Sequence, residues 1–211
     1  MSFEIIQPAF VDPRAELADG VYVGPFSVIG PHVKIGPGTR LENNVTIVGH
    51  TTIGRDNHLF PGVVVGAEPQ DVSYRGTDTR VEIGNRNILR ESVTVNRATE
   101  KEEGITSLGD DNFLMGGCHV AHDCRIGDHV LMANAVLLGG HVHLHDYAAL
   151  SGGAIVHHYT TIGRFSFTAG LSRVLHDVPP FMLCEGMPAR AERSTSWRCV
   201  GTISHRRPSR G

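Results

Sequence analysis

The sequence has few aromatic residues, no long apolar run and no recognisable leader. Aromatic side chains make up 6% of the 211 residues, whereas glycine occurs 25 times, a balance that suits a chain with many tight corners. No apolar run approaches the ~20 residues of a membrane span, so no integral membrane segment is expected. The first four residues, Met-Ser-Phe-Glu, lack the basic and apolar regions of a signal peptide.

Neither charge nor cysteine spacing indicates a specialised class. The net charge is −3, and no nucleic-acid surface is predicted on the repeating part of the chain. The four cysteines (Cys118, Cys124, Cys184 and Cys199) have no framework spacing, although Cys118 and Cys124 are six residues apart. We interpret them as reduced, mostly core residues of a cytoplasmic protein.

What the sequence does contain is a period of six residues. Aliphatic side chains recur at this spacing in three uninterrupted series, broken before Val174 only by Thr168. The series are Val11, Leu17, Val23, Ile29, Ile35, Leu41, Ile47, Ile53, Leu59, Val65; then Ile83, Leu89, Val95; then Leu108, Leu114, Val120, Ile126, Met132, Leu138, Leu144, Leu150, Val156, Ile162. A helix of 3.6 residues per turn cannot keep such a pattern on one face, and a flat strand would show period two.

A short strand followed by a corner does fit the period. Three such units form a triangular coil of eighteen residues with one aliphatic side chain per side pointing inward, and the coils stack as a solenoid. This is the hexapeptide repeat, and over residues 11–175 the chain resembles the left-handed parallel β-helix acyltransferases. The resemblance implies an all-β fold with left-handed coiling, a hand that the period alone does not give. A solenoid that serves only as a scaffold remains an alternative.

Two interruptions and a tail divide the chain. We expect a β-helix domain over residues 1–178, with loops extruded at 66–80 and 97–107, where the period fails. Such loops are usually functional, because they disturb a regular scaffold that does not need them to fold. Residues 179–211 form a polar, basic tail without the period.

Histidines crowd the last block of repeats, and the eighteen-residue coil aligns some of them. His122, Gly140 and His158 are eighteen apart, so they stack on one face at roughly the 4.8 Å strand spacing. Asp123 and His141 form the neighbouring column. A histidine beside a carboxylate can act as a general base, and the N–H of a close glycine can hold an oxyanion. The alternative is a zinc site of imidazoles, as in carbonic-anhydrase-like solenoids.

Five segments carry a closer resemblance, to the acyl-carrier-protein:UDP-N-acetylglucosamine O-acyltransferase family. They are residues 115–124 (MGGCHVAHDC), 79–84 (TRVEIG), 90–94 (RESVT), 138–142 (LGGHV) and 177–180 (DVPP). The resemblance implies that His122 is the general base, Asp123 its orienting partner and Gly140 the oxyanion donor. It further implies a substrate site made by Gln70, Asp71, His119, His141, His157 and His158, with Gly170 where acyl length is measured.

The implied activity is the first step of lipid A biosynthesis. A 3-hydroxyacyl chain moves from acyl carrier protein to the sugar 3-hydroxyl of UDP-N-acetylglucosamine, without metal or redox cofactor, in a site between subunits of a homotrimer. Two positions depart from the family, which usually has a lysine at Ser73 and a glutamine at His158. Another nucleotide sugar is therefore an alternative acceptor, and an inactive scaffold is a second alternative.

The tail also departs from the family, which continues into a helical domain that helps bind the nucleotide. Residues 193–211 do not match this domain, so it is expected to be missing or truncated. Two interpretations stay open: a divergent basic tail, or a frameshift near Arg193.

Overall fold

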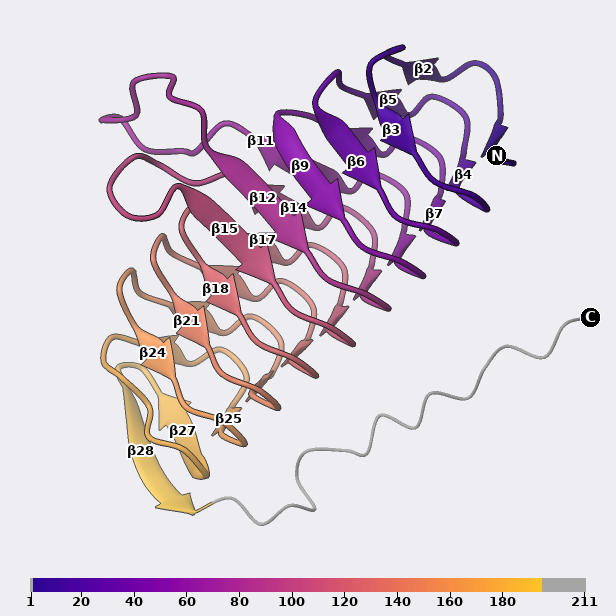
Figure 1. Cartoon of the computed structure of the whole chain (residues 1–211). Helices are drawn as coiled ribbons and strands as arrows, with labels where there is room; N and C mark the ends of the chain where they lie inside the picture. Colours follow the sequence, from indigo (N-terminus) through magenta and orange to yellow (C-terminus); the bar gives the residue numbers. More distant parts are fainter. Residues whose placement is uncertain (1, 195–211) are drawn as a thin grey trace, which may run out of the picture.

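The computed structural model of the chain describes residues 2–194. Their short parallel strands build three sheets that form the three sides of a coiled prism (Figure 1). Apart from the last strand, which pairs antiparallel, neighbours in each sheet run parallel. No helix occurs within residues 2–194, and none of their segments could therefore cross a membrane as a helix. The expected fold class, an all-β left-handed parallel β-helix, is confirmed.

Except for the last two strands, which both join the 11-stranded sheet, the strands are distributed over the three sheets in strict rotation. The 11-stranded sheet consists of β1 (Glu4–Ile5), β4 (Tyr22–Val23), β7 (Arg40–Leu41), β10 (His58–Leu59), β13 (Ile88–Leu89), β16 (Phe113–Leu114), β19 (Leu131–Met132), β22 (Ala149–Leu150), β25 (Phe167–Thr168), β27 (Met182–Gly186) and β28 (Ala189–Ser194). The 9-stranded sheet consists of β2 (Phe10–Val11), β5 (Val28–Ile29), β8 (Thr46–Ile47), β11 (Val64–Ala67), β14 (Thr94–Asn96), β17 (His119–Val120), β20 (Leu137–Leu138), β23 (Ile155–Val156) and β26 (Arg173–Val174). The 8-stranded sheet consists of β3 (Glu16–Leu17), β6 (Val33–Ile35), β9 (His50–Ile53), β12 (Arg80–Ile83), β15 (Ile105–Leu108), β18 (Arg125–Ile126), β21 (His143–Leu144) and β24 (Thr161–Ile162).

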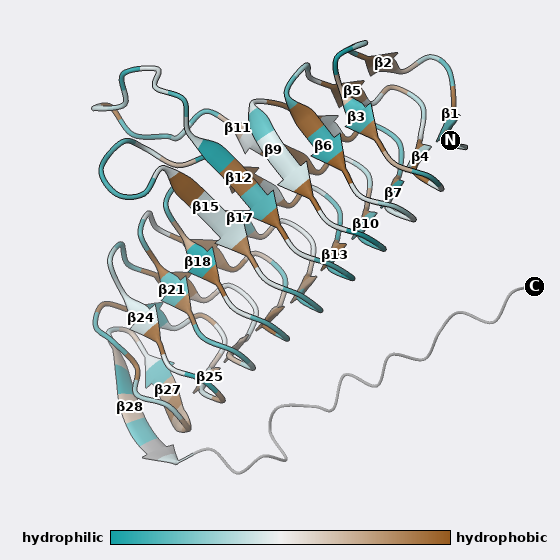
Figure 2. Cartoon of the chain, in the orientation of Figure 1, coloured by the Kyte–Doolittle hydropathy of each residue, from teal (hydrophilic) through white to brown (hydrophobic). Residues whose placement is uncertain are grey.

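The aliphatic residues of the six-residue period form the core. Each occupies an inward position of its strand, and those from Val23 to Ile162 are at most 4% exposed. In β12 the exposed and buried residues alternate, as the hydropathy bands of the 8-stranded sheet show in Figure 2. Cys118 and Cys124 are also buried as free thiols, and burial raises the pKa of Cys118 to about 11. Cys199, which was also expected to be reduced, lies outside the described residues.

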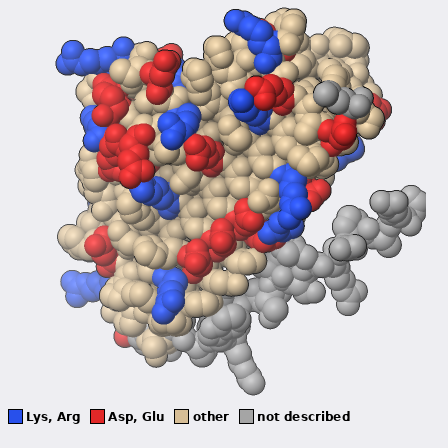
Figure 3. All heavy atoms as spheres, viewed as in Figure 1, with Lys and Arg blue, Asp and Glu red and all other residues tan. Residues whose placement is uncertain are grey.

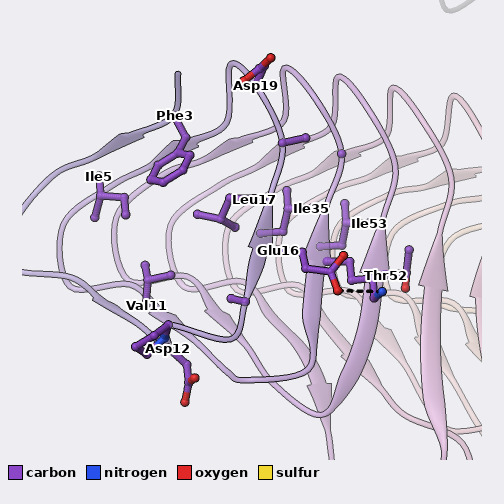
Figure 4. Close-up of a pocket in the computed structure, with 15 residues that line it drawn as sticks. Phe3, Ile5, Val11, Asp12, Glu16, Leu17, Asp19, Ile35, Thr52 and Ile53 are labelled. Carbon is purple, nitrogen blue, oxygen red and sulfur yellow. Dashed lines mark ion pairs between the residues drawn. The ribbon is translucent and has the colours of Figure 1, made fainter. Parts of the chain in front are cut away.

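The interior is least covered at the N-terminal end, before the first complete coil. Ile5, Val11 and Leu17 there line a hollow of about 890 Å³, and Phe3 lies beside it (Figure 4). Glu16 on the rim forms an ion pair with Lys34 at 2.9 Å. The apolar lining is the open end of the aliphatic core, and the acids Asp12 and Glu16 at its edge are paired with Arg14 and Lys34. The size of this hollow therefore does not make it the functional site.

Two connections are much longer than the other corners. Residues 68–79 join β11 to β12, and residues 97–104 join β14 to β15; we call them the first and the second excursion. Both protrude from the same corner of the prism in Figure 1, and acidic and basic side chains gather in that part of Figure 3. At the C-terminal end, β27 and β28 extend the 11-stranded sheet through residues that the sequence assigned to the tail.

Candidate active site

The predicted histidine stack lies at a corner between the 9- and 8-stranded sheets. His122 follows β17, and the N–H of His141, one coil further on, donates to the carbonyl of His122 at 3.0 Å. The N–H of Tyr159 continues the ladder to the carbonyl of Gly140 at 3.0 Å. The corner is opposite the first excursion, and the groove between them has a volume of about 380 Å³. Its lining residues are Gln70, His119, Ala121, His122, Leu137, Leu138, Gly139, Gly140, Ile155, Val156, His157 and His158.

His122 is paired with the carboxylate that follows it in the chain. Its Nδ1 lies 2.8 Å from Oδ2 of Asp123, a residue that is only 1% exposed. Thr99, in the second excursion, donates its N–H and its hydroxyl to the same carboxylate, the hydroxyl at 2.7 Å. Burial by itself would raise the pKa of Asp123, but the hydrogen bonds from His122 and Thr99 outweigh it and hold this pKa below its usual value. An ionised Asp123 orients the His122 ring with Nδ1–H toward itself, which leaves Nε2 as the proton acceptor.

Gly140 lies against the face of this ring. A Cβ atom built on Gly140 would lie 2.6 Å from Nε2 and 2.9 Å from Nδ1 of His122, so a larger residue cannot share the space with the imidazole. Among residues 2–194, no hydrogen bond uses the N–H of Gly140. The absence of a side chain thus brings an uncommitted backbone N–H close to the His122 ring, an arrangement that can serve as an oxyanion site.

A second imidazole–carboxylate pair adjoins the first. His141 is 5% exposed, its Nδ1 lies 2.7 Å from Oε1 of Glu102, and its ring stacks on Tyr159 at 4.2 Å. Its Nε2 has no hydrogen-bond partner and is 3.7 Å from Oδ2 of Asp123. The sequence identified His141 but not Glu102, whose only signal was its place in the charged run of the second excursion.

The first excursion brings Asp71 to the Nε2 side of the His122 ring. Oδ2 of Asp71 is 3.8 Å from Nε2 of His122 and 2.5 Å from Nζ of Lys101. The hydroxyl and the N–H of Ser73 donate to Oδ1 of Asp71 at 2.7 and 2.8 Å. Gln70 lines the groove, as the sequence predicts for a residue of this loop. Sequence reasoning missed the contacts of Lys101 and Thr99, as it missed that of Glu102.

The remaining predicted residues divide between the groove and a different corner. His119 bonds the hydroxyl of Thr94 through Nδ1 at 2.7 Å, and burial lowers its pKa. The rings of His157 and His158 lie 3.8 Å apart on the groove wall. Gly170 is not among the groove residues: it follows β25 at the corner between the 11- and 9-stranded sheets, beside Ser151 and Gly152.

His122, Asp123 and His141 also satisfy the distance requirement for a metal site. One donor atom from each lies within 4.8 Å of the others, and two imidazoles with a carboxylate suit Zn²⁺. However, Nδ1 of His122 is bonded to Asp123, Nδ1 of His141 is bonded to Glu102, and Asp123 accepts from Thr99. A metal would displace at least part of this network, so the arrangement favours proton transfer.

Known proteins share both the sequence pattern and the fold. Residues 14–49 match the family model described as bacterial transferase hexapeptide (six repeats). An acyl-[acyl-carrier-protein]--UDP-N-acetylglucosamine O-acyltransferase of Herminiimonas arsenicoxydans is 48% identical over 178 residues, which cover 84% of this chain and 68% of that protein. A protein of the same name from Thermodesulfovibrio yellowstonii is 46% identical over 187 residues, covering 89% of this chain and 72% of the relative.

Solved structures agree with these sequence relatives. The structure of LpxA from Acinetobacter baumannii superposes with a TM-score of 0.89 at 40% identity, covering 90% of this chain and 74% of that one. The UDP-N-acetylglucosamine acyltransferase of Francisella novicida gives a TM-score of 0.84 at 41% identity, with 85% and 66% covered. The matched share of the chain is far larger than residues 14–49, which match the repeat model.

Proposed function

The chain belongs to the acyl-[acyl-carrier-protein]--UDP-N-acetylglucosamine O-acyltransferase family, and from this premise we propose that it moves a 3-hydroxyacyl chain from acyl carrier protein to the 3-hydroxyl of UDP-N-acetylglucosamine. The reaction is the first step of lipid A biosynthesis. The observation that supports this reaction is the His122–Asp123 pair. Asp123 binds Nδ1 of His122, so Nε2 of His122 can accept a proton beside Gly140, whose N–H is uncommitted.

We propose direct acyl transfer at this pair. Nε2 of His122 takes the proton of the sugar hydroxyl, while the Asp123 carboxylate stabilises the imidazolium that forms. The hydroxyl oxygen attacks the thioester carbonyl, and the N–H of Gly140 donates to the resulting oxyanion. The intermediate collapses with cleavage of the carbon–sulfur bond, and the carrier-protein thiolate leaves with the proton from His122. An ester and a free thiol are the products, so atoms and charge balance with these groups alone.

We propose that the polar groove residues bind the acceptor. Gln70 and Asp71 approach from the first excursion, whereas His119, His157 and His158 supply ring faces and nitrogens from the wall. His141 is too buried to offer a broad contact, but its unpartnered Nε2 faces Asp123, so its main effect is on the catalytic pair. The role of Gly170 in acyl length stays a prediction, because it lies at a separate corner.

We also propose that the catalytic unit is residues 1–178 in a homotrimer and that it works in the cytoplasm. The 9-stranded sheet exposes Phe10, Val28, Leu137 and Ile155, the last two on the groove wall. Exposed apolar side chains aligned on one sheet are typical of an interface, and a second copy there would enclose the groove for an acyl chain. The buried free thiols are typical of a reducing compartment.

A charge on this sheet tests the interface. We expect the double variant Leu137→Glu, Ile155→Glu to elute as a monomer and to lose most transfer activity, because two carboxylates would be buried in an apolar contact. Light scattering after size-exclusion chromatography measures the mass. Thr52→Glu is the matched control, since Thr52 is an exposed outward residue of β9 in another sheet. A monomeric wild-type protein, or a trimeric double variant, would contradict the proposal.

The transfer reaction itself is tested with defined donors and acceptors. The protein is incubated with UDP-N-acetylglucosamine and a series of 3-hydroxyacyl carrier proteins, and products are identified by mass. We expect one acylated sugar nucleotide with a clear preference for one chain length. Other UDP-sugars test whether Ser73 and His158 have changed the acceptor. Absence of product from a folded trimer, or stoichiometric zinc in the purified protein, would overturn the proposal.

A further inference from the structure

The two excursions are joined by an ion pair that lies beside the catalytic histidine. Lys101 in the second excursion places Nζ 2.5 Å from Oδ2 of Asp71 in the first, and the Asp71 side chain is 13% exposed. The hydrogen bond from Lys101 is the largest influence that lowers the pKa of Asp71, and its bond to Asp71 raises the pKa of Lys101. The pair is therefore ionised throughout the neutral range.

The same oxygen of Asp71 that binds Lys101 is also the one nearest the base. Oδ2 is 3.8 Å from Nε2 of His122, which is beyond hydrogen-bond distance but within the range of an ion pair. Oδ1 is already occupied by the two donors of Ser73. If Lys101 did not hold Oδ2, a small rotation of the carboxylate would bring it onto Nε2, where it would stabilise the imidazolium.

Every charged or titratable group around His122 affects this balance. Asp123 lies on Nδ1 and Asp71 with Lys101 lies on the Nε2 side. His141 meets the ring edge-on at 5.2 Å and carries Glu102 on its far nitrogen, while His119, His157 and His158 face the groove. One carboxylate, Asp123, is needed to orient the ring. A second, uncompensated carboxylate on the catalytic nitrogen would hold the ring protonated and block it.

We propose that Lys101 is a positioning residue that keeps the Asp71 carboxylate off Nε2 of His122, so that this nitrogen stays free for the acceptor hydroxyl. The inference rests on the proposed function, since it assigns the proton transfer to His122. It also gives the second excursion a purpose beyond closing a loop. Three of its residues, Thr99, Lys101 and Glu102, contact Asp123, Asp71 and His141 in turn.

The test is the pH profile of kcat/KM for Lys101→Gln beside Lys101→Arg. Removing the cation exposes the base to Asp71, so we expect the acidic limb of the Lys101→Gln profile to move up by about one pH unit. At a pH below the limb, kcat/KM of Lys101→Gln is then roughly tenfold lower than that of the wild-type protein, and the difference disappears at higher pH. Lys101→Arg keeps the charge and should keep the limb of the wild-type protein.

A double variant separates this effect from a structural one. In Asp71→Asn, Lys101→Gln the amide cannot hold the ring protonated, so the acidic limb should return to its wild-type position even if the overall rate is lower. A merely structural ion pair would lower the rate at every pH and leave the limb in place. An unchanged limb in Lys101→Gln, or a displaced limb in the double variant, overturns the inference. Absence of transfer by the wild-type protein would instead refute the proposed function.

Discussion

His122→Ala is expected to lower kcat by about 10²- to 10⁴-fold, the range that a positioned general base contributes. The loss follows from the geometry, because Nε2 of His122 is the acceptor nitrogen that Asp123 leaves free on the groove side. Gly140 and the groove remain in the variant, so part of the transition-state stabilisation is kept and a residual rate is expected. KM for the sugar nucleotide should change far less than kcat, because the base acts on the reacting hydroxyl.

The control for this variant is His145→Ala. His145 lies on the same block of coils but is exposed and outside the groove, so its removal should leave the rate within twofold of the wild-type protein. Both variants should unfold at similar temperatures, since neither ring belongs to the aliphatic core. A His122→Ala enzyme with more than a tenth of the wild-type kcat would show that another group, such as His119, is the base.

The six-residue period predicted the fold because one physical condition repeats along the whole chain. Every sixth residue must fill the interior, and the strand register of eighteen residues, as between Val11 and Ile29 or Leu137 and Ile155, follows from three sides per coil. The same register stacks His122, Gly140 and His158 without any reference to function. Hence the stacking of these three coil residues was predictable from the sequence, whereas the stacking of Tyr159 on His141 was not predicted.

The excursions were beyond this reasoning because they leave the period. No register relates Thr99, Lys101 or Glu102 to the histidine columns, so the sequence could show that a charged loop exists but not what it contacts. The structure brings all three to the His122–Asp123 pair and its neighbours. Gly66 shows why the chain needs glycine where it departs toward the first excursion. Its φ is +81°, and a Cβ added there would clash with the carbonyl of Val48.

Gly140→Ala is expected to lower kcat by about 10²-fold or more, although it adds a single methyl group. The added Cβ would lie 2.6 Å from Nε2 of His122, about 1 Å inside ordinary contact, so the ring must move away from its place above the amide. A displacement of about 1 Å at a reacting group can cost about 10²-fold in rate. Because the methyl meets a side chain that can swing toward the groove, the coil itself should still form.

Gly152→Ala provides the matched control for the Gly140 variant. Gly152 lies at another corner of the same prism, and a Cβ there would meet only the carbonyl of Asn134 at an ordinary 3.5 Å. We therefore expect Gly152→Ala to keep both activity and thermal stability, whereas Gly140→Ala keeps stability and loses activity. Equal rates in the two variants would show that the His122 ring does not need its position against Gly140. Equal losses would point to backbone rigidity at the corners instead of displacement of the His122 ring.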